Sequence, residues 1–177
     1  MIFPNPYPPD LIRLCSHSVT LIPRVATTSL RLLGTKTEQT DRIVCIIRDP
    51  IDRWISGYVR WLYTRARWID NKVRWEAPHH LYYDAHTAPQ WCQAPVLYSN
   101  THYIHLEEID RYAERCKVSI THENHDSKSL SWCYEKTRTW IDTNHIWREL
   151  LIDFLQRDYI LKTRCVPVDS IPESWFE

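Results

Sequence analysis

The chain has 177 residues, of which 44% are hydrophobic and 25% are charged, and its formal net charge at pH 7 is +0. These values are typical of a single globular domain and exclude a chain that is disordered throughout, which needs a lower hydrophobicity and a larger net charge. The only glycines are Gly34 and Gly57, so glycine-rich phosphate loops are excluded, and no apolar run is long enough to cross a bilayer.

Positive charge is concentrated in the first part of the chain. Residues 1–75 contain 12 Lys and Arg against 6 Asp and Glu, whereas residues 76–177 contain 10 against 16. Arginine accounts for 16 of the 22 basic residues, and its planar guanidinium group forms two parallel hydrogen bonds with phosphate or sulfate. The first part of the chain therefore favours an anionic ligand.

The N-terminal residues and the cysteines indicate the compartment. Residues 1–10 contain neither the basic segment nor the apolar segment of a signal peptide. The six cysteines are scattered and form no CxxC pair, which favours reduced thiols over disulfides or a zinc site. We therefore expect a cytoplasmic protein without a membrane span.

In chain order, the first predicted unit is a strand followed by a helix. Residues 1–18 are expected to be an extended lead-in, and residues 19–22 form a short buried strand that Pro23 ends. A helix begins at residues 29–33, with Thr27 or Thr28 as its N-cap and Gly34 as its stop. A strand, a polar loop and a helix N-terminus in this order are typical of a phosphate-binding site.

The second predicted unit has the clearest local signals. Residues 43–47, IVCII, are apolar throughout, as in a strand of a parallel sheet that is buried on both faces. Asp49 is a suitable N-cap, Pro50 occupies the first helical position, and apolar residues recur at helical spacing as far as Ile69. The other face of this helix carries Arg53, Ser56, Arg60 and Arg67.

The remainder begins with a long segment that lacks periodicity. Residues 70–100 are rich in His, Pro and aromatic side chains, and so long a loop is typical of a substrate-binding segment, here an acceptor-site loop. After it we expect a strand at 102–106, a short helix at 107–116, a strand at 117–120 and a polar loop at 122–131. A helix at 143–157 follows, and residues 166–177 are extended. The buried stripe of that helix would be Ile146, Trp147, Leu150, Leu151, Phe154 and Leu155. This alternation predicts an α/β fold, a parallel sheet flanked by helices, in one domain covering residues 1–177.

Four segments resemble, in the same order, motifs of one enzyme family. LIPRVATTSLRLL, residues 21–33, is similar to the 5′-phosphosulfate loop of sulfotransferases that use 3′-phosphoadenosine 5′-phosphosulfate (PAPS), and IRDPIDRWISGY, residues 47–58, is similar to their 3′-phosphate motif. DAHTAPQ, residues 84–90, and YIHLEEI, residues 103–109, resemble later elements of the carbohydrate sulfotransferases of the Golgi-membrane type. The resemblance implies a minimal sulfotransferase-type domain with a P-loop-like sheet, which transfers a sulfuryl group from PAPS to a hydroxyl of a carbohydrate.

The resemblance also implies which residues bind PAPS. The loop around the 5′-phosphosulfate consists of Arg24, Val25, Ala26, Thr27, Thr28 and Ser29, whereas Arg48 and Ser56 bind the 3′-phosphate. Backbone N–H groups, hydroxyls and a helix N-terminus suit these roles because all of them donate to anionic oxygens. Ser56 is expected to point away from the apolar stripe, with its hydroxyl available. Arg24 stands where the family has Lys, and it can still stabilise charge on the oxygen that bridges phosphorus and sulfur.

Transfer to a hydroxyl also needs a base that takes the acceptor proton. His86, in the DAHTAPQ segment, is the candidate, and Asp84 would orient it or act as the base itself. His17 and Glu38 flank the first strand–helix unit and are the alternatives.

Other readings of the sequence remain open or are disfavoured. No metal is expected, because His102 and His105 would face opposite sides of a strand, and HENH at residues 122–125 lacks the spacing of HExxH. Trp68, Trp75 and Trp91 could stack on a sugar. One alternative function is a bisphosphate-binding protein without transfer activity. Another is a nucleic-acid-binding module, against which the acidic second part of the chain argues.

Overall fold

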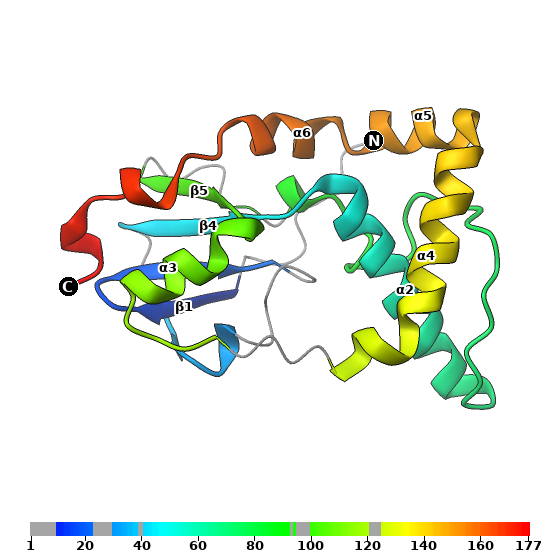
Figure 1. Cartoon of the computed structure of the whole chain (residues 1–177), viewed down its shortest axis with the longest axis horizontal. Helices are drawn as coiled ribbons and strands as arrows, with labels where there is room; N and C mark the ends of the chain where they lie inside the picture. The colour runs from blue at the N-terminus through cyan, green and yellow to red at the C-terminus, as the bar shows by residue number, and fades with distance from the viewer. Residues whose placement is uncertain (1–9, 23–29, 39–40, 93, 95–99, 121–124) are drawn as a thin grey trace.

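The computed structural model describes residues 10–22, 30–38, 41–92, 94, 100–120 and 125–177. Within these residues the fold is α/β, with a mixed sheet of five strands flanked by helices (Figure 1). The strands are β1 (Asp10–Leu14), β2 (His17–Leu21), β3 (Thr35–Lys36), β4 (Ile43–Ile47) and β5 (Thr101–His105). Their order across the sheet is β3-β1-β2-β4-β5.

The sheet is mixed because β1 runs antiparallel to both of its neighbours, β2 and β3. Strand β4 pairs in parallel with β2 on one side and with β5 on the other. The prediction of a parallel sheet is therefore wrong at this side, and residues 10–14, expected to be extended lead-in, form a strand. The sequence carried no hairpin signal, because the turn at Cys15, with a φ of 53°, uses neither Gly nor Asn.

Helix α2 (Pro50–Ile69) has the predicted bounds, and its start is fixed as expected. The Asp49 side chain accepts hydrogen bonds from the backbone N–H groups of Ile51 and Asp52, both at 3.1 Å. Strand β4 also matches its prediction, and all five of its residues are buried. The predictions of these two elements are correct because each element combines an apolar pattern with specific residues at its boundary.

After β5 the chain is mostly helical. The helices are η2 (Leu106–Glu108), α3 (Ile109–Arg115), α4 (His125–Thr143), α5 (His145–Phe154) and α6 (Gln156–Thr163). The predicted loop at 122–131 is wrong from His125 onward, because α4 begins there. The predicted helix at 143–157 is divided instead, since the Asn144 side chain caps a new helix by accepting from the Trp147 N–H at 3.2 Å.

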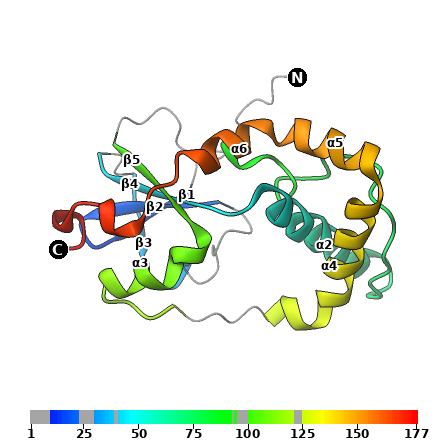
Figure 2. The same ribbon diagram turned by 45° about the horizontal axis from the view of Figure 1, so that its top comes forward.

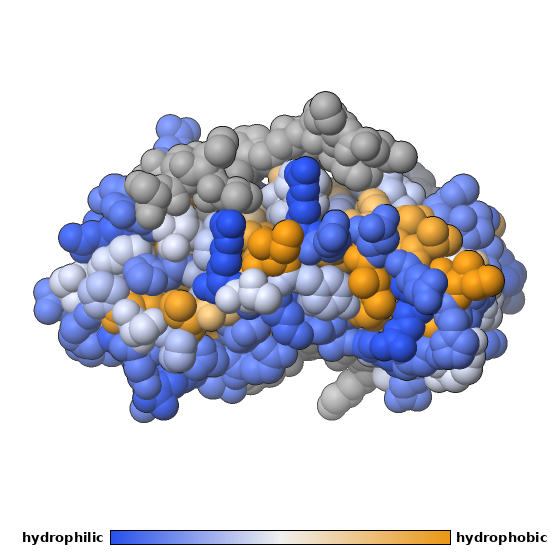
Figure 3. Space-filling view, turned by 90° about the horizontal axis from the view of Figure 1, so that it is seen from above, coloured by the Kyte–Doolittle hydropathy of each residue, from blue (hydrophilic) through white to orange (hydrophobic). Residues whose placement is uncertain are grey.

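Two smaller predictions in this part are also wrong. Residues 117–120 form no strand, because Lys117 has a φ of 55° and the Val118 N–H bonds back to the Ala113 carbonyl at 3.0 Å, closing α3. On α5, Leu151 and Leu155 are buried, but Ile146 and Leu150 are 76% and 53% exposed. Figure 3, which looks onto the α5–α6 side, shows orange apolar residues among charged ones at this end.

Buried apolar side chains form two separate clusters. One lies on the sheet and includes Val44, Ile46 and Tyr112, whereas the other joins α2, α4 and α5 through Trp54, Tyr58, Cys133, Ile141 and Leu151. Figures 1 and 2 show the sheet at one end of the molecule, α2 and α4 at the other, and α6 alongside both. The junction between the clusters is where β4 ends and α2 begins.

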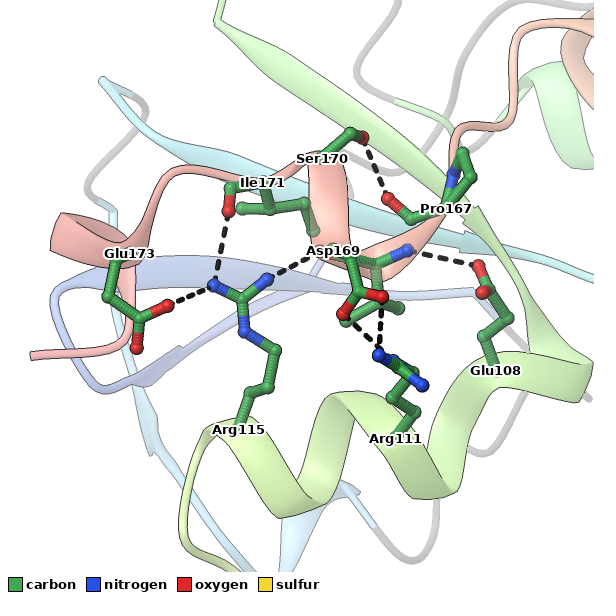
Figure 4. Close-up of polar contacts among 9 residues, drawn as sticks. Glu108, Arg111, Arg115, Pro167, Asp169, Ser170, Ile171 and Glu173 are labelled. Carbon is green, nitrogen blue, oxygen red and sulfur yellow. Dashed lines mark hydrogen bonds and ion pairs between the residues drawn. The ribbon is translucent and has the colours of Figure 1, made fainter.

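The C-terminal segment covers the end of the sheet that lies opposite the junction of β4 and α2. Residues 166–177, expected to be extended, contain the 3-10 turns η3 (Val168–Ser170) and η4 (Glu173–Trp175), and Trp175 and Phe176 are buried. Figure 4 shows how α3 holds this segment. Arg115 donates to the Ile171 carbonyl at 3.2 Å, and Arg111 pairs with the Asp169 carboxylate at 2.8 Å.

Both edges of the sheet are short or covered. Strand β3 has only two residues, both exposed. At the other edge, the Val166 N–H donates to the Tyr103 carbonyl of β5 at 2.8 Å, and Cys165 forms a single parallel bridge with Tyr103. Within the described part of the chain, no helix combines the length and the apolar character needed to cross a membrane.

Candidate functional site

The predicted phosphate-binding segments follow adjacent parallel strands. Because β2 and β4 are parallel and paired, with Thr20 opposite Cys45, their carboxyl ends lie at one edge of the sheet. Strand β2 leads into residues 23–29, which lie outside the described residues and include Arg24, Val25, Ala26, Thr27, Thr28 and Ser29. Leu30 and Arg31 directly after them are helical. Strand β2 precedes the segment as predicted, whereas only Leu30 and Arg31 of the helix predicted at residues 29–33 are helical among the described residues, and residues 32–34 form a turn and a bend.

The DAHTAPQ segment docks at the end of β4 through the Gln90 side chain. The Arg48 backbone N–H donates to Gln90 Oε1 at 3.0 Å, and Gln90 Nε2 donates to the Arg48 carbonyl at 2.8 Å. The amide therefore pairs with the Arg48 backbone as a neighbouring strand would. Gln90 is completely buried. Its role was missed in the sequence because nothing in the motif shows which backbone its amide meets.

Two buried charged side chains, Asp158 and Arg53, hold the same segment from both sides. The Asp158 carboxylate of α6 accepts from the N–H groups of Gln90 at 2.7 Å and Trp91 at 2.9 Å. The Arg53 guanidinium of α2 donates to the Ala88 carbonyl. Both charged side chains have 0% exposure, so the helix face that carries Arg53, opposite the predicted apolar stripe, is also buried at this position. Burial raises the pKa of Asp158, although the Arg53 charge and the hydrogen bonds act in the opposite direction.

Close packing against α2 and internal hydrogen bonds fix the shape of the segment. A Cβ added at Gly57 would lie 2.0 Å from the His86 carbonyl oxygen, so only glycine allows this approach. The buried Thr87 hydroxyl accepts from the Tyr83 N–H at 2.8 Å and donates to the Asp84 carbonyl at 3.0 Å. The segment that contains the predicted base is therefore held rigidly beside the start of α2.

His86 and Asp84 contact each other, and both are partly accessible. The distance from His86 Nδ1 to Asp84 Oδ2 is 3.2 Å. The backbone N–H of His86 donates to Asp84 Oδ1 at 2.8 Å. The side chains are 39% and 34% exposed. Partial burial raises the pKa of Asp84, but the hydrogen bonds and charge of His86 outweigh it, so the pKa is below its usual value. An ionised Asp84 holds the proton of His86 on Nδ1 and leaves Nε2 able to accept one.

The alternative bases lie in other surroundings. His17 is completely buried at the amino end of β2, at the opposite edge from residues 23–29. Its Nδ1 donates to the Trp175 carbonyl at 2.8 Å, and its Nε2 lies 2.5 Å from the Tyr112 hydroxyl. Burial lowers the pKa of His17, with the Trp175 carbonyl opposing and Arg42 adding to the effect. Both ring nitrogens of His17 are therefore engaged inside the protein, and Glu38 is exposed beyond β3, two strands away from β2.

The two residues predicted to bind the 3′-phosphate differ in exposure. Arg48 is half-buried at the end of β4. Ser56 is only 7% exposed, so the expectation of an open hydroxyl is wrong. Ser56 shares a helical face with Arg53 and lies next to Gly57, and the DAHTAPQ segment covers this region.

Polar groups from α4 and α6 surround the start of α2. The Tyr134 hydroxyl donates to Asp52 Oδ1 at 2.9 Å, and the Arg138 guanidinium pairs with the same carboxylate. Lys162 Nζ lies 2.8 Å from Asp49 Oδ2, and this hydrogen bond raises the pKa of Lys162. These residues were missed in the sequence, because no element was predicted over residues 132–142 or 158–165.

The remaining predicted site residues are dispersed. Lys136 lies over the Trp75 ring at 4.5 Å, and Arg157 lies over the Trp91 ring at 4.4 Å, whereas Trp68 is 85% exposed. The His102 ring packs on Trp175, with ring centroids 4.8 Å apart. The described residues contain no group of three or more His, Cys, Asp and Glu arranged to hold a metal ion.

In comparisons with known proteins, no family model matches the chain, and neither a curated protein nor a solved structure matches it significantly.

Proposed function

We propose that the protein binds PAPS and transfers its sulfuryl group to a hydroxyl of a carbohydrate acceptor. The observation that carries the proposal is the junction of β4 and α2. Arg48 ends a central parallel strand there, and the segment with His86 and Asp84 is locked to the Arg48 backbone by Gln90. In open α/β sheets, ligands bind beyond the carboxyl ends of parallel strands, and this junction has that position.

The proposed roles follow the chemistry of each group. The backbone and hydroxyl groups of residues 24–29 hold the 5′-phosphosulfate, and Arg48 holds the 3′-phosphate. The acceptor oxygen forms a new bond to sulfur while the bond from sulfur to the bridging oxygen breaks, releasing adenosine 3′,5′-bisphosphate. Arg24 stabilises the negative charge on that leaving oxygen. His86 Nε2 takes the proton of the acceptor hydroxyl, and Asp84 stabilises the resulting imidazolium.

The test compares two nucleotides that differ in the 3′-phosphate. Arg48→Ala should weaken binding of adenosine 3′,5′-bisphosphate about tenfold or more, since a charged hydrogen bond is worth about 1.5–3 kcal/mol, and should barely change AMP binding. Isothermal titration calorimetry measures both affinities. The control is Arg67→Ala, which removes an exposed arginine of α2 whose guanidinium lies over the Tyr63 ring. Equal losses for both nucleotides, or no binding of the bisphosphate by the wild type, would contradict the proposal.

A bisphosphate-binding protein without transfer activity is the second candidate, because Arg24 replaces the lysine of the resembled family. Turnover of labelled PAPS with pooled glycans separates the two functions. If the loop is catalytic, Arg24→Ala should lower the rate by ~10²–10³, the usual effect of removing one donor to a developing oxyanion, while Arg24→Lys keeps or raises it. A wild type that binds the bisphosphate and never turns over PAPS would favour the second candidate.

A further inference from the structure

Two cysteines that are far apart in the sequence lie close together at the end of the sheet where β2 begins. Cys15 lies in the turn between β1 and β2, and Cys116 directly follows α3. The Cys15 Sγ lies 3.6 Å from the Cys116 carbonyl oxygen, which brings the Cys15 thiol against the backbone of Cys116. Both cysteines are free thiols in this structure.

The two cysteines of the pair differ in burial. Cys116 is 5% exposed, and burial raises its pKa to about 12, with a hydrogen bond from Tyr112 opposing and the Cys15 thiol adding to the effect. Cys15 is half-buried and therefore accessible to a small oxidant. A partly exposed thiol beside a buried second thiol has the layout in which one cysteine reacts first and the other resolves the intermediate.

We propose that Cys15 and Cys116 form a reversible disulfide when the protein meets a disulfide oxidant such as oxidised glutathione. The Cys15 thiolate attacks one sulfur of the oxidant and releases one molecule of reduced glutathione. The Cys116 thiolate then attacks the Cys15 sulfur of the mixed disulfide and releases the second glutathione. The two protein thiols lose two electrons in total, the oxidant gains them, and the two thiol protons pass to solvent or to the released thiolates.

The bond would join the turn between β1 and β2 to the end of α3. It would close a loop between positions 15 and 116, and long loops are those in which a crosslink restricts the unfolded chain most. Tyr112, which contacts both the Cys116 thiol and His17 Nε2, lies next to the bond. We therefore expect the oxidised protein to unfold at a higher temperature than the reduced protein.

The experiment uses the full chain incubated with excess oxidised glutathione, followed by thiol titration and peptide mass mapping without reductant. The wild type should lose two of its six thiols and yield a crosslinked peptide pair containing positions 15 and 116. Cys165→Ser removes another half-buried thiol, whose Sγ lies 3.8 Å from the Leu161 carbonyl, and it should form the same crosslink.

Cys15→Ser should form no crosslink and show no rise in melting temperature on oxidation, and Cys116→Ser should stop at one glutathione bound at Cys15. Using the accessible Cys15→Ser variant keeps the test independent of any folding defect at buried Cys116. Recovery of positions 15 and 116 as free or separately glutathionylated thiols in the wild type would overturn the proposal. An equal loss of thiols in Cys15→Ser would also overturn it.

Discussion

Gly57→Ala tests whether α2 and the DAHTAPQ segment touch as closely as the structure has them. The new Cβ would lie 2.0 Å from the His86 carbonyl oxygen and 2.6 Å from its carbon, and ordinary contacts at such a position are 3.4 Å or more. One of the two backbones must therefore move by more than 1 Å. Hydrogen bonds of Thr87 and Gln90 oppose that movement, because they hold the segment on both sides of the contact.

The expected magnitude combines three effects. Overpacking costs about 1–3 kcal/mol, and each buried hydrogen bond broken by the shift costs about 1–3 kcal/mol. Alanine favours a helix over glycine by about 1 kcal/mol, which offsets part of the loss. We expect a net decrease of about 2–4 kcal/mol in the free energy of unfolding. With a urea dependence of about 1–3 kcal/mol per molar, the midpoint falls by roughly 1–2 M.

Urea denaturation followed by tryptophan fluorescence measures this midpoint. Thr64→Ala is the matched control, since Thr64 is exposed on the same helix, and its free energy of unfolding should stay within about 0.5 kcal/mol of that of the wild type. If Gly57→Ala is as stable as the wild type or more stable, the contact between α2 and His86 does not exist in solution.

Three further predictions concern the buried acid, the buried histidine and the candidate base. Asp158→Ala should lower the free energy of unfolding by about 3–5 kcal/mol, measured in urea, because the Gln90 and Trp91 N–H groups lose their buried acceptor and the buried Arg53 charge loses the carboxylate near it. Since burial holds the pKa of His17 below 6.5, the unfolded chain binds the proton more tightly; stability should be full above pH 6.5 and fall as the pH drops below it. His17→Gln should flatten this part of the stability profile, and a wild-type profile flat between pH 5 and 7 would contradict the burial. His86→Ala should reduce turnover by ~10²–10⁴ while the bisphosphate affinity stays within about threefold, and a lower melting temperature with full turnover would make His86 structural.

The parts of the fold that could be predicted are those with local signals. Strand β4 and helix α2 combine an unbroken apolar pattern with Asp49 and Pro50 at their boundary, so the bounds of α2 follow from the sequence. Strand β1 and helix α4 have weaker patterns. The turn at Cys15 has no glycine, and the hydrophobic face of α4 is interrupted by polar residues, so tertiary packing decides both.

The candidate site could be predicted from the sequence only where its residues belong to contiguous motifs. Arg48, Asp84 and His86 could be selected because their motifs are contiguous in the sequence. Gln90, Asp158 and Arg53 act through contacts between segments that are far apart along the chain, and buried charged groups leave no periodic pattern in the sequence. The burial of Arg53 therefore could not be predicted, since a charged side chain on the polar face of a helix is usually solvated.

The covered and shortened edges of the sheet affect how the molecule behaves in concentrated solution. A long exposed strand offers unpaired N–H and C=O groups to which another chain can add a strand, and this is a common start of aggregation. Strand β3 offers only two residues, one of them Lys36, while residues 165 and 166 occupy the middle of the outer side of β5. Any change that detaches Val166 from Tyr103 would therefore expose the outer edge of β5, next to the fully apolar β4. Another chain could then add a strand at this edge, and the protein would precipitate more readily.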